Sequence, residues 1–329
     1  MITLDSIRKA VEAELEAYNE FVEQQFSTSG GLISEMVNYA LTSRGKGIRP
    51  LLVVLAAVLN APNRAVASGR RVSLAATLVE MIHVSSLIHD DVIDESDMRR
   101  GKPSINARWQ SNKAVILGDY ILSRTLNIGL QSGQFDLVTH ICGAIATLCE
   151  GEIEQADCVQ KQVVSREDYF DVIYKKTACL LGISASAGAM AVRSTHDKIV
   201  QMRRLGEAIG IAFQIQDDIL DYRPDAKTGK ESCNDLREGK ITLPLIAVLE
   251  RVDEERRAEI LDRLKRCHDD ENSVEYLRRL VENEGGLDAA REAMHQYVNR
   301  AMAILAQYDK SDAQKAMADL CLYIVERDQ

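Results

Sequence analysis

The chain has 329 residues, of which 46% are hydrophobic, 5% are aromatic and only five are proline. This is enough apolar material for a large core, and long proline-free spans rich in Ala, Leu, Ile, Glu, Lys and Arg favour an all-α fold over sheets. The net charge of −10 argues against a nucleic-acid partner, because proteins that bind nucleic acids usually carry a basic stripe.

The sequence also predicts a cytoplasmic protein without a transmembrane segment. The first five residues include an acid and lead into an amphipathic segment, which is unlike a secretory leader. The longest uncharged run, residues 177–192, has 16 residues and is diluted by Gly, Ser and Ala, whereas a membrane span needs roughly 20 apolar residues. The seven cysteines form no C-x-x-C pair, so we expect them to be reduced and packed in the core.

In chain order, the pattern predicts helices over residues 2–25, a second helix before a basic loop at 43–50, and then helices over 50–59, 65–96, 106–132, 135–161, 166–192 and 198–222. A polar loop follows at 223–239, and Thr242 is expected to N-cap the next helix. The remainder is expected to form charged amphipathic helices. No second domain boundary and no repeat is found, so we expect a single-domain helical bundle over residues 1–329.

The motif Asp-Asp-x-x-Asp occurs twice, at residues 90–94 and 217–221. In a helix, residues four and seven apart share a face, so His83, Asp90 and Asp94 would align. Paired carboxylates cannot stay ionised in a cleft without a cation, and Mg²⁺ is the natural partner for oxygen ligands. Either motif alone is more often a solvated helix face. Two such motifs with identical spacing, each of which interrupts an apolar helix, favour a metal site.

Basic residues accompany these motifs. The loop Gly45-Lys46-Gly47-Ile48-Arg49 lies at the start of a predicted helix and would make an anion cradle, although such a loop alone is more often only solvated. Arg99 and Arg100 follow the first acidic motif. Lys176 interrupts an apolar helix, where snorkelling from a helix end explains it equally well.

Together these residues resemble the trans-isoprenyl (polyprenyl) diphosphate synthase family. The marks run in the family's order over residues 45–245, and residues 87–101 and 326–329 look most like the bacterial octaprenyl diphosphate synthases. The resemblance implies an all-α, single-domain helical bundle of the isoprenoid synthase type with a central apolar cavity. It also implies a prenyltransferase that condenses isopentenyl diphosphate onto an allylic diphosphate such as farnesyl diphosphate, and commonly a homodimer.

The resemblance further implies a role for each matching residue. The metal site, for about three Mg²⁺ ions, would comprise Asp90, Asp94, Asp217 and Asp221, with support from Asp91 and Asp218. The allylic diphosphate would be held by Arg99, Lys176, Thr177, Gln214, Lys230 and Lys240. Isopentenyl diphosphate would be held by Lys46, Arg49, His83 and Arg100. The chain departs from the family pattern at Gly47, where a basic residue is common, and at Cys233, where glycine is usual.

The implied reaction breaks an allylic carbon–oxygen bond, so the departing diphosphate must be neutralised and water kept out. Mg²⁺ with Lys and Arg would do the first, and the loop 223–239 is a candidate lid for the second. Ser85 and Ser86 lie one turn before Asp90 and would leave a shaft open for a long, octaprenyl product. Alternatively, these small residues simply allow close helix packing.

Other functions stay open at this stage: a short- or medium-chain synthase, a terpene cyclase or head-to-head synthase, a non-catalytic subunit of a heteromeric prenyl synthase, or an unrelated helical protein with acidic patches. The basic residues argue for a second diphosphate pocket and so against the cyclase and the unrelated protein. Two intact acidic motifs argue against a silent subunit.

Overall fold

The computed structural model describes residues 2–27, 30–42, 45–161, 165–223 and 233–326. The predicted Lys230 and most of the candidate lid lie outside the described residues. In chain order the helices are α1 Leu4–Lys9, α2 Glu12–Phe26, α3 Gly31–Thr42, α4 Ile48–Asn60, α5 Arg64–Ala67, α6 Arg70–Ile93, α7 Ile105–Trp109, α8 Ser111–Gln131, α9 Phe135–Lys161, α10 Arg166–Ile173, the π-helix η1 Tyr174–Ala178, α11 Cys179–Ala191, α12 His196–Asp221, α13 Asn234–Arg237, α14 Leu243–Leu249, α15 Glu254–Arg266, α16 Glu271–Asn283, α17 Gly286–Leu305 and α18 Asp312–Glu326. The all-α prediction is confirmed.

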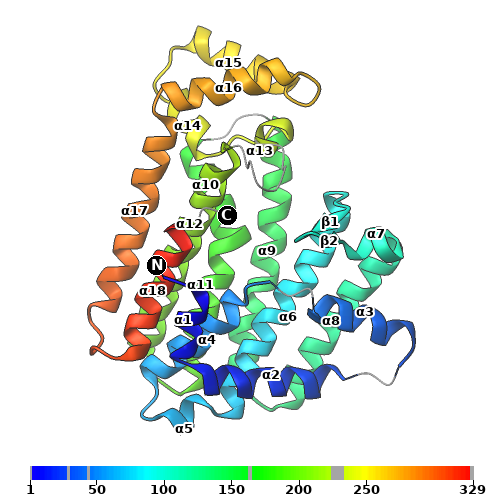
Figure 1. Cartoon of the computed structure of the whole chain (residues 1–329), viewed down its shortest axis with the longest axis vertical. Helices are drawn as coiled ribbons and strands as arrows, with labels where there is room; N and C mark the ends of the chain where they lie inside the picture. Colours follow the sequence, from blue (N-terminus) through cyan, green and yellow to red (C-terminus); the bar gives the residue numbers. More distant parts are fainter. Residues whose placement is uncertain (1, 28–29, 43–44, 162–164, 224–232, 327–329) are drawn as a thin grey trace.

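Helix α11 lies at the centre of the bundle and packs against α4, α6, α9 and α12 (Figure 1). It carries no charged residue, and all its residues but one are buried, as expected for a helix that is apolar all round. The core continues outward through α2, α8 and α17, whereas α15 and α16 project at one end of the molecule (Figure 1). The C-terminal ends of α6 and α12, which carry the two acidic motifs, both point toward this end.

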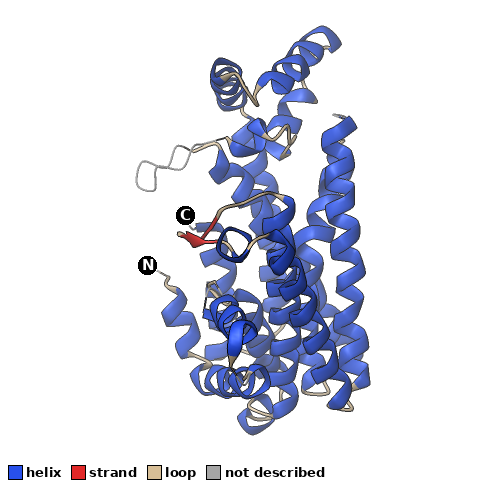
Figure 2. Ribbon diagram, turned by 90° about the vertical axis from the view of Figure 1, so that its right-hand side faces the viewer, coloured by secondary structure: helices blue, strands red, loops and turns tan. Residues whose placement is uncertain are grey.

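A two-residue hairpin is the only sheet among the described residues (Figure 2). Strands β1 Met98–Arg99 and β2 Lys102–Pro103 pair antiparallel around Arg100 and Gly101, which both have positive φ. Positive φ at both central residues is the pattern of a type I′ turn, which suits the twist of a tight hairpin. The basic loop after the first motif is therefore a rigid turn.

Several predicted boundaries were wrong. The first predicted helix is split into α1 and α2, and the helix predicted over 65–96 begins at Arg70, because the chain turns at Gly69, and ends at Ile93. The predicted helix 166–192 contains the π-helical turn η1. Thr242 stands at the N-cap of α14, but its side chain makes no cap hydrogen bond and its hydroxyl is buried without a partner among the described residues.

One described stretch, Arg64–Ile93, is long and apolar enough for a membrane span by length and composition. Within it, 78% of the most apolar window is buried inside the molecule. Burial of this kind is typical of a core helix, and here it places α6 between α2, α4 and α8.

Candidate active site

The two acidic motifs lie at the same end of the bundle, and two lysines lie close to both of them. Lys176 on η1 and Lys240 before α14 line one small cavity of about 200 Å³ together with Asp218 and Asp235. Burial alone would lower the pKa of Lys240, but Glu238, Asp235 and Asp94 together raise it. Because Asp94 belongs to the first motif and Asp235 follows the second, Lys240 lies between the two. We refer to Asp90, Asp94, Glu152, Asp217, Asp218, Asp221 and Asp235 as the acidic cluster.

Asp90 occupies an environment that disfavours its charge. Burial, and then the neighbouring Glu152 and Asp94, raise the pKa of Asp90 to about 7, and Lys176 only partly offsets this. Glu152 on α9 forms an ion pair of 3.0 Å with Lys176. Surplus negative charge in a half-buried site is the condition that a divalent cation relieves, so the donor set fits Mg²⁺.

No three acidic, His or Cys side chains of the described chain converge into a ready-made metal cage. This arrangement suits Mg²⁺, which usually keeps several waters and is held by one or two carboxylates plus substrate phosphates. Asp90, Asp94 and Asp217 remain the carboxylates that the sequence predicts for this task.

Asp218 and Asp221 are already engaged within the protein. Asp218 accepts hydrogen bonds from Tyr169 and Gln214. The two carboxylate oxygens of Asp221 accept the backbone N–H groups of Asn234 and Asp235, both at 3.1 Å, and so cap α13. Asp221 therefore anchors the described last part of the candidate lid, in addition to any share in the metal site.

Cys233 explains why glycine is usual at its position. Its φ is +64°, in the left-handed region, and its side chain is fully buried. Its N–H donates to the carbonyl of Asp221 at 2.7 Å, which holds this strained backbone in place. A side chain in this conformation costs roughly 1–2 kcal/mol, which glycine avoids. The departure from the family pattern thus stores strain at the edge of the candidate lid.

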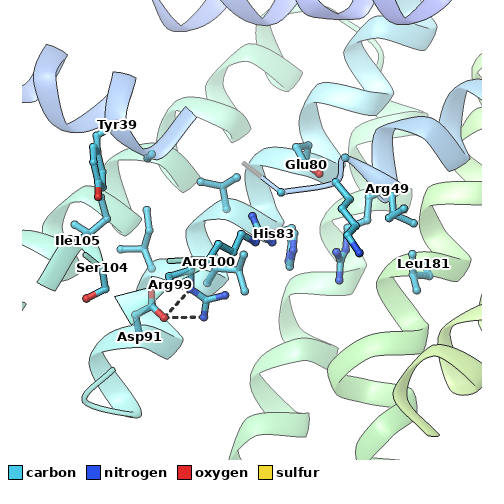
Figure 3. A pocket seen from close by; sticks show the side chains of 18 of the residues that line it. Tyr39, Arg49, Glu80, His83, Asp91, Arg99, Arg100, Ser104, Ile105 and Leu181 are labelled. Carbon is cyan, nitrogen blue, oxygen red and sulfur yellow. Dashed lines mark hydrogen bonds and ion pairs between the residues drawn. The ribbon is translucent and has the colours of Figure 1, made fainter. Parts of the chain in front are cut away.

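On the other side of the C-terminal end of α6 lies the largest cavity, of about 800 Å³ (Figure 3). We refer to it as the basic cavity, because it is lined by the cationic side chains Lys46, Arg49, Arg99 and Arg100 together with His83, Glu80 and Asp91. All four residues predicted to hold isopentenyl diphosphate therefore line one space. Its apolar wall includes Val84, Leu87, Ile88, Leu181 and Phe213.

Electrostatics show that the basic cavity has surplus positive charge. Burial lowers the pKa of His83 well below its usual range, and Arg49, Arg100 and Arg99 lower it further, so His83 is neutral near pH 7. Burial also lowers the pKa of Arg49, to about 10, although Glu80 opposes this. The Nε of Arg49 is buried and has no hydrogen-bond partner among the described residues. An unpaired buried donor is costly, which indicates a missing anionic ligand.

Arg99 lies elsewhere than its predicted role suggests. Its guanidinium is paired with the buried Asp91, at 2.6–2.8 Å from both carboxylate oxygens (Figure 3). Both residues line the basic cavity. Asp91 thus acts by holding Arg99, and Arg99 stands at the boundary between the basic cavity and Asp90.

The position of Arg100 requires a glycine at residue 45. Arg100 has a φ of +53° in the hairpin turn, and its guanidinium packs on Gly45, where an added Cβ would lie 2.3 Å from Cζ.

The neighbouring Lys46 contacts residues from the first and the last helix of the chain. The carbonyl of Lys46 accepts a hydrogen bond of 2.7 Å from Arg8 on α1, and its ammonium lies 5.6 Å from the ring centroid of Tyr323 on α18. Gly47 has a φ of +57° and lines the cavity with backbone alone.

The structure separates the two serines of the predicted shaft. Ser85 is 2% exposed and donates 2.9 Å to the carbonyl of Gly118 on α8, so it serves the close packing of α6 against α8. Ser86 is half-buried and bonds only the carbonyl of His83 within its own helix. The role of Ser86 in chain length therefore stays a prediction.

Sequence reasoning missed Glu152, Asp235, Glu80 and Tyr169. Each lies outside the acidic and basic motifs but contacts or faces one of their residues. The pair Gly151-Glu152 offered a signal, because it breaks a helix of otherwise amphipathic pattern. A Cβ at Gly151 would lie 2.9 Å from the backbone nitrogen of Lys176, so this glycine lets α9 approach η1.

Comparison with known proteins decides the family. A family model described as polyprenyl synthetase matches residues 31–281. The octaprenyl diphosphate synthase of Haemophilus influenzae is 31% identical to this chain over 329 residues, which cover 99% of this chain and 98% of that protein. The chain belongs to the polyprenyl synthetase family. It is a prenyltransferase with the all-α isoprenoid synthase fold.

Other polyprenyl synthetases show the same architecture with different named products. The short chain isoprenyl diphosphate synthase of Methanothermobacter thermautotrophicus is 30% identical over 333 residues, covering 100% of this chain and 99% of that protein. The crystal structure of polyprenyl synthase from Caulobacter crescentus, complexed with calcium and isoprenyl diphosphate, has a TM-score of 0.89 at 30% identity and covers 99% of this chain and 98% of that chain.

We predict that Asp90→Asn stabilises the metal-free protein increasingly as the pH rises. Because the pKa of Asp90 is raised to about 7, the folded state binds its proton more tightly than the unfolded chain, and the wild type loses stability as this proton leaves between about pH 4 and about pH 7. The free energy of unfolding of the variant minus that of the wild type should grow over this window and then level off. Denaturant unfolding in EDTA measures this difference, and a flat difference would contradict the prediction.

Proposed function

We propose that this polyprenyl synthetase uses Mg²⁺ to make a long-chain all-trans polyprenyl diphosphate, adding isopentenyl diphosphate repeatedly to an allylic diphosphate such as farnesyl diphosphate. The observation that carries this proposal is the separation of charge around the end of α6. On one side, burial and neighbouring carboxylates raise the pKa of Asp90 in the acidic cluster, and on the other Lys46, Arg49 and Arg100 line the basic cavity. Two diphosphates, one with metal and one without, complement this pair of sites.

The basic cavity suits the diphosphate of isopentenyl diphosphate. Lys46, Arg49 and Arg100 bring three cations to it, and guanidinium groups match phosphate oxygens through paired N–H donors. His83 is neutral and can donate one N–H without adding charge. No metal is needed here, because the arginines and lysine already supply the countercharge.

The acidic cluster suits the allylic diphosphate. Asp90, Asp94 and Asp217 would hold Mg²⁺, whose chemistry when bound is to polarise the diphosphate oxygens and neutralise the leaving group. Lys176 and Lys240 would hold the same diphosphate from the protein side, and the predicted Lys230 would join them. Glu152 holds Lys176 until the diphosphate competes for it.

The apolar wall of the basic cavity would support carbon–carbon bond formation. Leaving of the allylic diphosphate produces a carbocation, which the double bond of isopentenyl diphosphate attacks, and the departed diphosphate would then accept the proton that is lost. Leu87, Leu181 and Phe213 belong to this apolar wall and would exclude water from the cation. No side-chain nucleophile is required, because the cation reacts directly with the double bond.

A product assay tests the proposal. Purified protein, labelled isopentenyl diphosphate, farnesyl diphosphate and Mg²⁺ should yield octaprenyl diphosphate or a product of similar length, and EDTA should abolish the reaction. Products that stop after one addition would support a short-chain synthase instead. A chain with no turnover, restored by a second protein, would support a subunit of a heteromeric synthase.

We predict that Ser86→Phe shortens the product. A phenyl ring one turn before Asp90 would obstruct the growing tail, whereas the hydroxyl of Ser86 bonds only its own helix. Ser85→Phe is the matched control: it would force α6 away from α8 at Gly118 and should lower the melting temperature by several degrees. Thin-layer chromatography of dephosphorylated products measures chain length. If Ser86→Phe makes a product of unchanged length, the growing tail does not pass Ser86.

We also propose that the chain forms a homodimer through α8 and α9. These neighbouring helices expose large apolar side chains, with Ile116 66%, Leu130 55%, Phe135 61% and Ile153 70% exposed. Burying such side chains against a second copy would contribute about 1.5–3 kcal/mol each. The occupant is taken to be a second copy because the resemblance to the isoprenyl diphosphate synthases implies a homodimer.

Ile116→Glu combined with Phe135→Glu should convert the dimer to a monomer, because charged groups would have to be desolvated in the interface. Val66→Glu on α5, at 39% exposure, is the control and should leave the dimer intact. Size-exclusion chromatography with light scattering measures the mass. A wild type that is monomeric at micromolar concentration would overturn the proposal.

A further inference from the structure

Tyr169 lies behind the second acidic motif and is 5% exposed. A capping box fixes the first turn of α10, since Ser165 accepts the N–H of Asp168 and Asp168 accepts that of Ser165. The ring of Tyr169 packs edge-on against Phe170, with centroids 5.3 Å apart. The rigid start of α10 therefore places the hydroxyl of Tyr169, which donates 2.6 Å to Oδ2 of the buried Asp218.

From Asp218 a chain of hydrogen bonds runs to the predicted diphosphate site. The other oxygen, Oδ1, accepts from Nε2 of Gln214 at 3.1 Å, and Oε1 of Gln214 accepts from the hydroxyl of Thr177 at 2.9 Å. Thr177 follows Lys176 in the π-helical turn η1. The chain thus joins α10, α12 and η1 through side chains alone.

The donors in this chain have one consistent direction. An amide nitrogen can only donate, so Nε2 of Gln214 donates to Oδ1 of Asp218, while Oδ2 of Asp218 accepts the hydroxyl of Tyr169. The amide oxygen of Gln214 must then face Thr177, and the single hydroxyl proton of Thr177 is used in that bond. Oγ1 of Thr177 is left as an acceptor beside Lys176. If Asp218 could rotate, the amide of Gln214 could flip and the direction of the whole chain would be lost.

We propose that Tyr169 is a positioning residue for the allylic diphosphate site: by holding Asp218 it fixes the orientation of Gln214 and Thr177. This inference rests on the proposed function, because it takes η1 to face that diphosphate. Tyr169 itself contacts neither reactant in this scheme. Its phenol is suited to the task, since its hydroxyl satisfies one oxygen of a buried carboxyl that would otherwise be left without a partner.

Tyr169→Phe tests the inference, because it removes one oxygen and keeps the ring against Phe170. The KM for farnesyl diphosphate should rise about ten-fold, as expected when one hydrogen bond to a buried polar group is lost. The KM for isopentenyl diphosphate should change less than about two-fold, because the basic cavity shares no bond with this chain. Equal rises in both constants, or none, would overturn the inference, and so would loss of the fold, which would make the role structural.

Two control variants sharpen the result. Gly45→Ala displaces the guanidinium of Arg100 and should raise the KM for isopentenyl diphosphate while leaving that for farnesyl diphosphate. Tyr308→Phe also removes a tyrosine hydroxyl bond, here to Asn60 at 3.3 Å, but in a region away from both sites. It should change neither constant, and a rise in the KM for farnesyl diphosphate in Tyr308→Phe would show that the readout follows general destabilisation.

A double-mutant cycle tests the connection itself. Thr177→Val breaks the far end of the chain, so adding Tyr169→Phe should raise the KM for farnesyl diphosphate little further. Independent, multiplying effects would refute the hydrogen-bond chain as the cause. A wild type without condensation activity would instead refute the proposed function, whereas an active wild type with an unchanged Tyr169→Phe variant would refute only the role of Tyr169.

Discussion

The repulsion among carboxylates at the end of α6 is the constraint on which the rest of this site depends. Asp90 is partly buried beside Glu152 and Asp94, and burial together with these two carboxylates raises its pKa. In the basic cavity the charges have the opposite sign. Burial and the charge of Arg100 lower the pKa of Arg49, and burial and the charge of Arg99 lower that of Arg100. The helix keeps the two sets apart, so neither neutralises the other. Each remains available for an outside partner of opposite charge.

The protein stabilises this separation by committing selected residues internally. Asp91 holds Arg99, Glu152 holds Lys176, and Asp221 caps α13. Asp91 and Glu152 each neutralise one cation and fix the direction of its side chain, and Asp221 fixes the backbone of α13. Charged pairs of this kind contribute little to stability where they are exposed. Their value here is orientation.

Unusual backbone occurs in several segments around the candidate site. Arg100 and Cys233 have left-handed conformations, and η1 is a π-helical turn that carries Lys176 and Thr177. Strained and π-helical backbone persists where the surrounding packing holds it, and it is frequent at functional sites. The core helices α4 and α11 are regular by contrast, which provides the rigid support that the strained segments need.

The sequence by itself determined that the protein is all-α and that two helices carry acidic motifs of identical spacing, and its resemblance to a known family predicted a diphosphate substrate and a divalent cation. These conclusions were accessible because each motif lies within one helix, where spacing alone decides which side chains share a face. Only the tertiary structure decided that Arg99 pairs with Asp91, that Ser85 serves helix packing while Ser86 does not, and that Glu152 and Tyr169 join the site. Those contacts bring together residues from different elements or depend on the direction of a side chain, and no local pattern encodes either of them.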